Sequence, residues 1–203
     1  MTEVVVDNCA LLHAVQMGAL QYPPLPLVAA LLESGALRMV TTKAVRGELS
    51  QSIEHVVAAW EGRGWLRTQN VSLQQLRALG NLSRRPKPGR NDLALIALAV
   101  ALGAPLLTHD APAQHYALDK GVGVQVIDLL DLVLWACHRG LAPLEALSAA
   151  WGAEPHPEWP KGWAGSATAE WAQRQSARSA LWAAVGGAAA DHGPLGASRD
   201  SEG

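Results

Sequence analysis

Short apolar runs of strand length alternate with longer helical patterns along most of this 203-residue chain. The runs fall at residues 4–6, 38–40, 66–71, 104–108 and 122–127. Those that are apolar throughout, such as VVV at 4–6, are typical of strands covered on both faces of a sheet. Strands that alternate with helices favour parallel pairing. The sequence therefore predicts an α/β fold, a three-layer α/β/α domain with a mostly parallel central sheet.

Helical patterns fill the intervals between these runs. They cover residues 10–20, 27–37, 43–60, 72–82, 91–103, 109–121, 128–140 and 141–151. Thr41 and Thr42 offer an N-cap for the helix at 43–60, and Ser72 offers one for the helix at 72–82. Gly103 is placed to end the helix that begins near Asn91.

The composition of the chain changes after residue 151, so we expect the α/β domain to occupy residues 1–151. Residues 152–166 are rich in Pro and Gly and predict a linker. Residues 167–185 predict one amphipathic helix, and residues 186–203 a disordered tail. Five of the eight tryptophans follow position 150, which indicates a Trp-rich helical extension that docks on a surface.

Composition excludes some classes of protein. Sixteen Lys and Arg against eighteen Asp and Glu give a formal charge of −2, so any nucleic-acid binding must come from a local basic patch. No secretory signal is visible, and the apolar runs are too short and broken to span a membrane. Cys9 and Cys137 are far apart in apolar surroundings, which predicts two buried, reduced thiols in a cytoplasmic protein without membrane contact.

Four carboxylates fall at the ends of predicted elements. Asp7 and Asp110 follow strands, and Asp92 lies in the first turn of a helix. Glu48 lies in the helix that starts just after the strand at 38–40. Ligands of open parallel sheets bind outside the carboxyl ends of the strands, so these side chains can share one cleft. Carboxylates gathered in this way repel one another unless a cation is present, and hard oxygen ligands suit Mg²⁺ or Mn²⁺. Such a site has the chemistry of a phosphodiesterase.

The acids and their surroundings resemble a known family, the PIN-domain ribonucleases, which includes the VapC-like toxins. The resemblance is carried by VVVDNCALL, TTKAVRGEL, GRNDLALIALAVALGAPLLTHD and VQVIDL, and covers roughly residues 1 to 135. It implies a Mg²⁺- or Mn²⁺-dependent endoribonuclease that hydrolyses single-stranded or looped RNA. The catalytic and metal-binding residues that it implies are Asp7, Glu48, Asp92 and Asp110, with Thr108 as a supporting group.

One position departs from the pattern of that family. Many members carry Asn or Ser two residues after the first Asp, where this chain has Cys9. Asn8 stands next to Asp7 instead, and we expect it to act as the supporting polar group there.

A local basic patch precedes Asp92. In SRRPKPGR the prolines prevent a helix, and a loop beside the acids is placed to hold RNA phosphates. The predicted RNA-binding residues are Arg84, Arg85, Lys87 and Arg90, together with Lys43 and Arg46 near Glu48.

The resemblance also implies partners. A toxin of this family is paired with an antitoxin protein that occupies the cleft, and a homodimer is common. Two alternative functions stay open. One is a catalytically inactive PIN-like module that binds nucleic acid or acts as a scaffold. The other is a phosphotransferase-like enzyme with Asp7 as nucleophile, although the haloacid-dehalogenase pattern needs a second Asp where Cys9 stands.

Overall fold

The computed structural model describes residues 1–19, 27–49, 51–80, 87–119 and 121–141. The elements that lead into and build the first three strands are β1 (Thr2–Val6), α1 (Asn8–Ala19), α2 (Leu27–Glu33), β2 (Leu37–Thr42), α3 (Lys43–Gly47), α4 (Gln51–Gly62) and β3 (Leu66–Gln69). The remaining elements are α5 (Leu73–Gly80), α6 (Arg90–Leu102), β4 (Leu106–Leu107), α7 (Ala111–Ala117), β5 (Val126–Ile127) and α8 (Leu129–His138). The predicted helix at 141–151, the linker, the amphipathic helix and the tail lie outside the described residues, apart from residue 141.

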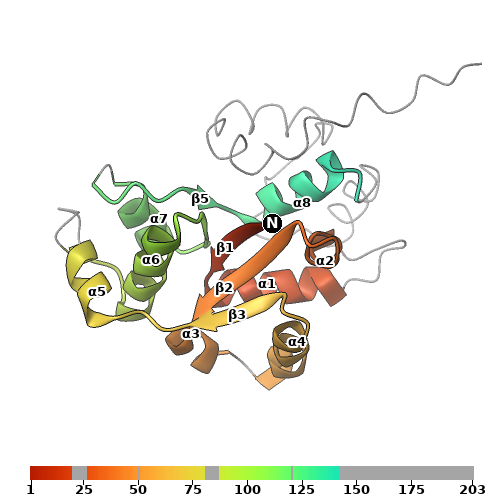
Figure 1. The fold of residues 1–203 in the computed structure, drawn as a ribbon, viewed down its shortest axis with the longest axis horizontal. Helices are drawn as coiled ribbons and strands as arrows, with labels where there is room; N and C mark the ends of the chain where they lie inside the picture. Colours follow the sequence, from red (N-terminus) through yellow and green to blue (C-terminus); the bar gives the residue numbers. More distant parts are fainter. Residues whose placement is uncertain (20–26, 50, 81–86, 120, 142–203) are drawn as a thin grey trace, which may run out of the picture.

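A five-stranded sheet with the order β3-β2-β1-β4-β5 forms the centre of the fold (Figure 1). All four strand pairings are parallel, with Val5 of β1 opposite Val40 of β2 and Leu106 of β4. Because every strand runs the same way, their carboxyl ends meet at one edge of the sheet. The predicted parallel sheet is confirmed.

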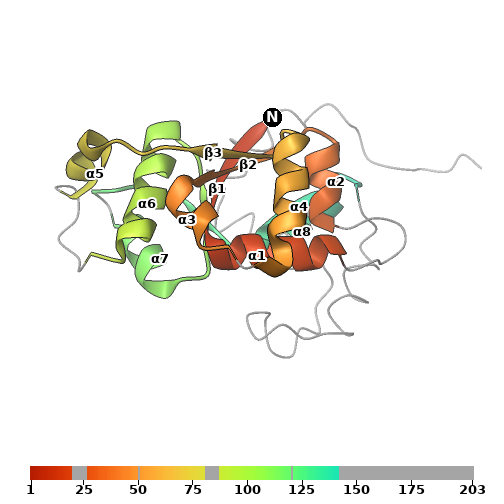
Figure 2. The ribbon, with the colours of Figure 1, turned by 90° about the horizontal axis from the view of Figure 1, so that it is seen from below.

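Helices cover both faces of the sheet. Figure 2 shows α1, α2, α4 and α8 on one side and α5, α6 and α7 on the other. The side chains of β1 divide between the two layers, since Val4 and Val6 belong to one buried cluster and Val5 to the other. This alternation explains why VVV is apolar throughout, and the three-layer α/β/α architecture is confirmed.

The helix expected at 43–60 is corrected to two helices. Val45 of α3 packs in the cluster on one face of the sheet, whereas Val57 and Trp60 of α4 pack in the cluster on the other face. A single straight helix cannot reach both layers, so α3 ends at Gly47 with Glu48 as its C-cap. The break therefore leaves Glu48 where the chain crosses the carboxyl edge of the sheet.

The expectation of a buried Cys9 is also wrong. Cys9 is exposed, because α1 turns Ala10, Leu11 and Ala14 toward the core instead. None of the helices within the described ranges is both long and apolar enough to cross a membrane.

Candidate active site

Asp7 is a buried carboxylate at the end of β1, and the residue is only 6 % exposed. Its Oδ1 accepts a hydrogen bond from the Ala10 backbone N–H at 2.6 Å. Its Oδ2 accepts one from the Thr108 hydroxyl. Burial raises the pKa of Asp7 above its ordinary value, although these two hydrogen bonds and nearby His109 act in the opposite direction. The carboxylate is thus oriented by two donors in a place that disfavours its charge.

Thr108 connects Asp7 to the next acid along the edge. It follows β4, is 1 % exposed, and its Oγ1 accepts the Asp110 backbone N–H at 3.1 Å. Asp110 is half-buried and caps α7, where its Oδ2 accepts the Ala113 N–H at 2.8 Å. Asp110 also raises the pKa of Asp7, which places the two carboxylates within electrostatic range.

Asp92 lies in the first turn of α6, the helix that leads into β4, so it begins at the same edge. Its carboxyl pKa is raised by partial burial and then by the charges of Asp110, Asp7 and Glu48. The Gly89 backbone N–H donates to it and lowers the pKa. A Cβ on Gly89 would lie 2.9 Å from Asp92 Oδ2, so a glycine allows this close approach.

Glu48 completes the group from α3. Its side chain is exposed, and its Oε1 accepts a hydrogen bond from the Asn91 amide. This contact ties the end of α3 to the first turn of α6. Asn91 and Gly89 are site residues that the sequence analysis did not assign, although their positions directly before Asp92 were a signal.

The four predicted acids therefore lie toward the carboxyl edge of the sheet, where the charges of the other three contribute to raising the pKa of Asp92. Their donor set consists of carboxylate oxygens and suits Mg²⁺ or Mn²⁺ in its chemistry. Among the residues that the structure describes, however, no three Asp, Glu, His or Cys side chains are already arranged to hold a metal ion. The site thus fits a divalent cation by charge and donor type, without a preformed coordination shell.

Asn8 and the basic residues are placed as follows. Asn8 begins α1 and is half-buried, and its supporting role stays a prediction. Lys43 and Arg90 are exposed at the starts of α3 and α6, and Lys87 is exposed just before α6. Arg84 and Arg85 lie outside the described residues.

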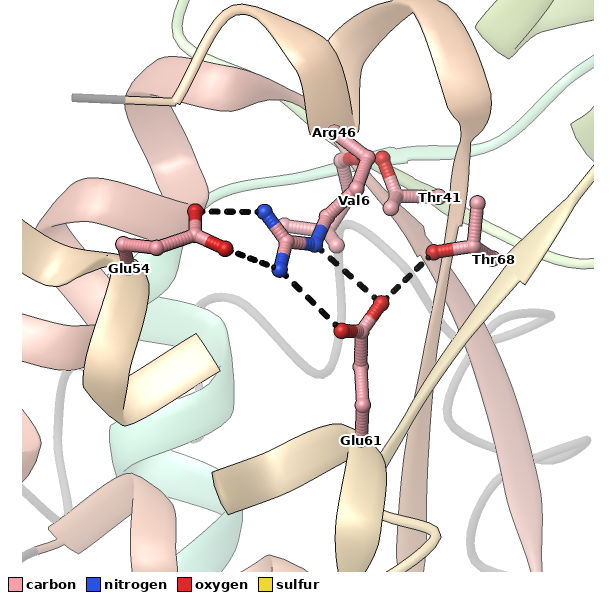
Figure 3. A network of polar contacts seen from close by, with 6 residues as sticks. All are labelled: Val6, Thr41, Arg46, Glu54, Glu61 and Thr68. Atoms are coloured by element: carbon pink, nitrogen blue, oxygen red, sulfur yellow. Dashed lines mark hydrogen bonds and ion pairs between the residues drawn. The ribbon is translucent and has the colours of Figure 1, made fainter. Parts of the chain in front are cut away.

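Arg46, whose contact with RNA stays a prediction, makes a network of ion pairs within the fold (Figure 3). Its Nη1 and Nη2 bind the two carboxylate oxygens of Glu54 at 2.6 Å each. Its Nε and Nη2 bind Glu61 at 3.2 Å, and Thr68 donates to Glu61 Oε1 at 2.9 Å. Both carboxylates raise the pKa of Arg46. The guanidinium thus joins α3 to α4 and, through Thr68, to β3, beside the turn that carries Glu48.

A second contact in the same view supports Asp7. The Thr41 hydroxyl of β2 donates to the Val6 carbonyl of β1 at 2.9 Å (Figure 3). Thr41 is fully buried, so this bond fixes the backbone directly before Asp7. Of the two threonines expected to cap the helix at 43, Thr42 takes the N-cap position of α3.

Comparison with solved structures finds proteins of similar fold. No protein-family model and no curated protein matches the chain. A solved structure of a PilT N-terminus domain protein, SSO1118 from the hyperthermophilic archaeon Sulfolobus solfataricus P2, is similar at 18 % identity and a TM-score of 0.39. The match covers 66 % of this chain and 93 % of that one.

Proposed function

We propose that the chain is a divalent-metal-dependent endoribonuclease that hydrolyses RNA phosphodiester bonds. The observation that carries the proposal is the position of Asp92, whose carboxyl pKa is raised by partial burial and also by the charges of Asp110, Asp7 and Glu48. Structural stability alone gives no reason to gather four carboxylates at one edge, because like charges destabilise a fold. A bound cation would offset this repulsion.

Asp7, Glu48, Asp92 and Asp110 are the residues that would hold Mg²⁺ or Mn²⁺. The bound ion would supply an activated water and charge stabilisation at the phosphate. Thr108 and the Ala10 N–H keep the Asp7 carboxylate in one orientation. The Gly89 N–H orients Asp92 in the same way, and Asn91 orients Glu48.

Cations near the acids would bind the RNA backbone. Lys43, Lys87 and Arg90 are exposed close to Glu48 or Asp92 in the chain, and their charges favour phosphate. We include Arg84 and Arg85 by their sequence positions alone. A toxin role with an antitoxin partner, and a homodimer, are proposals that rest only on the resemblance to PIN-domain ribonucleases.

One observation favours the alternative of an inactive PIN-like module that binds nucleic acid or acts as a scaffold. The described acids do not form a ready coordination shell. In such a module the basic residues would still bind RNA, but no metal-dependent cleavage would follow.

Cleavage of a mixed pool of single-stranded RNA tests the proposal. We expect cleavage with Mg²⁺ or Mn²⁺, none with EDTA, and a loss of about 100-fold or more in Asp92→Asn, because metal catalysis contributes several kcal/mol. Glu33→Gln is the control. Glu33 is an exposed acid at the end of α2, so this substitution removes the same charge away from the site. If the folded wild-type protein does not cleave RNA, the nuclease proposal is wrong and the binding-module alternative takes its place. If Asp92→Asn cleaves like wild type, the acids are not the site.

A further inference from the structure

A pocket of about 340 Å³ adjoins the acidic site. It lies between the start of α3, the end of β3, α5 and the start of α6. Its lining residues are Thr42, Lys43, Ala44, Gln69, Asn70, Val71, Leu76, Arg90, Asn91 and Ala94. Asn91 lines the pocket and also donates a hydrogen bond to Glu48, so the pocket lies next to the acidic site. The volume falls at the lower end of the range for small-molecule sites.

The lining combines three kinds of chemistry. Lys43 and Arg90 are exposed cations that favour a phosphate. Val71 and Leu76 are partly buried and provide apolar contact. Gln69 and Asn70 supply amides at the end of β3. This mixture suits a ligand that has an anionic group, a flat apolar face and a polar edge.

Gln69, one of the lining residues, carries an amide oxygen without a hydrogen-bond partner in the described part of the chain. Gln69 Oε1 is buried and accepts no hydrogen bond from any residue that the structure describes. A buried acceptor without a donor costs free energy, and a ligand that brings an N–H group would recover it once the Gln69 amide turns its oxygen toward the pocket. The pocket therefore favours a ligand with a hydrogen-bond donor on its polar edge.

We propose that this pocket binds one nucleobase of a single-stranded RNA substrate, beside the phosphate that is cleaved. The inference rests on the proposed function and adds a base-recognition site to it. The Gln69 amide turns toward the pocket, and its Oε1 accepts an N–H from the base edge. Val71 and Leu76 contact the face of the base, and Lys43 and Arg90 bind the flanking phosphates.

The unpartnered oxygen also sets a base preference. Adenine and cytosine present an exocyclic amino group, and guanine presents two adjacent N–H donors. The base-pairing N–H of uracil is flanked by two carbonyl oxygens, which repel Gln69 Oε1. Adenine, cytosine and guanine are therefore preferred, and uracil is disfavoured.

Titration of the metal-free protein with AMP, CMP, GMP and UMP, followed by amide NMR shifts, tests the pocket without cleavage. We expect the three amino-bearing nucleotides to bind about 5- to 10-fold more tightly than UMP, the effect of one hydrogen bond. Gln69→Leu should remove this difference in affinity, whereas Arg90→Ala should weaken the binding of all four nucleotides alike. Gln125→Leu is the matched control, because exposed Gln125 lines a separate pocket of about 330 Å³ beside Val122 and Gly123.

The outcomes separate this inference from the proposed nuclease. Gln69-dependent nucleotide binding without any RNA cleavage would support the base-binding pocket and overturn the proposed nuclease activity. RNA cleavage with equal binding of all four nucleotides in wild type and Gln69→Leu would keep the nuclease and overturn the pocket. Binding of inorganic phosphate as tightly as the nucleotides would also overturn it, since the base would then add nothing to the affinity. A thermal melt of Gln69→Leu checks that the variant is folded.

Discussion

Asp7→Asn is expected to make the metal-free protein more stable while it abolishes cleavage. Asp7 is buried, and burial raises its pKa. A carboxyl with a raised pKa in the folded state stabilises the fold fully below its unfolded pKa, and this contribution is lost as the pH rises through the folded pKa. At neutral pH the ionised group is therefore disfavoured. Asparagine removes the charge, can still accept the Ala10 N–H, and can donate to the Thr108 hydroxyl.

Thermal melts in EDTA measure this effect across a pH series. Near pH 7 we expect the melting temperature of Asp7→Asn to exceed that of wild type by about 2–4 °C, which for a chain of this size corresponds to roughly 1 kcal/mol. The difference should shrink as the pH falls toward the ordinary pKa of an aspartate. Cleavage should fall by about 100-fold or more.

Glu33→Gln, which removes an exposed charge far from the site, should change neither the melting temperature nor cleavage. A lower melting temperature for Asp7→Asn at every pH would contradict the account. The ionised Asp7 would then stabilise the fold, and its burial would need no functional explanation.

Gly89→Ala is expected to disable the site through one added methyl group. The new Cβ would fall 2.9 Å from Asp92 Oδ2, closer than real Cβ contacts, so the carboxylate must move. Gly89 has a φ of −54°, which alanine adopts without strain, so the backbone should stay in place. Since Asp92 is the acid that interacts with the other three, we expect cleavage to fall by about 10- to 100-fold, as when the support of a metal ligand is lost.

Gly62→Ala is the matched control for this variant. Gly62 is the last residue of α4, and a Cβ there meets nothing within 4 Å. It should cleave like wild type and be slightly more stable, because alanine favours a helix over glycine. Steady-state cleavage rates and thermal melts of both variants test this prediction. Wild-type cleavage by Gly89→Ala would show that the position of Asp92 is not critical.

The sheet and the location of the acids could be predicted from sequence because both follow from local patterns. VVV at 4–6 is apolar throughout, since Val4 and Val6 face one layer and Val5 the other. The acid that follows such a strand must lie at its carboxyl end, and parallel pairing brings those ends together. Asp7 and Asp110 could be located by this rule alone.

Other features depend on tertiary contacts that no local pattern carries. The segment at 43–60 has a helical composition, yet Val45 and Val57 belong to opposite layers, so the helix breaks. The ion pairs of Arg46 could not be predicted either. The break between α3 and α4 allows Glu54 and Glu61 of α4 to face the Arg46 guanidinium. Gln69 could not be identified because its significance is an unpartnered oxygen, which is a property of the packed structure.

Binding of Mn²⁺ to the acids tests the central claim most directly, by calorimetry or by the EPR signal of free Mn²⁺, on wild type, Asp92→Asn and Glu33→Gln. The account predicts that wild type and Glu33→Gln bind Mn²⁺ equally, and that Asp92→Asn binds at least about 10-fold more weakly. Equal Mn²⁺ affinity in Asp92→Asn and wild type, or no binding by folded wild type, would contradict the claim that these four carboxylates form a metal site.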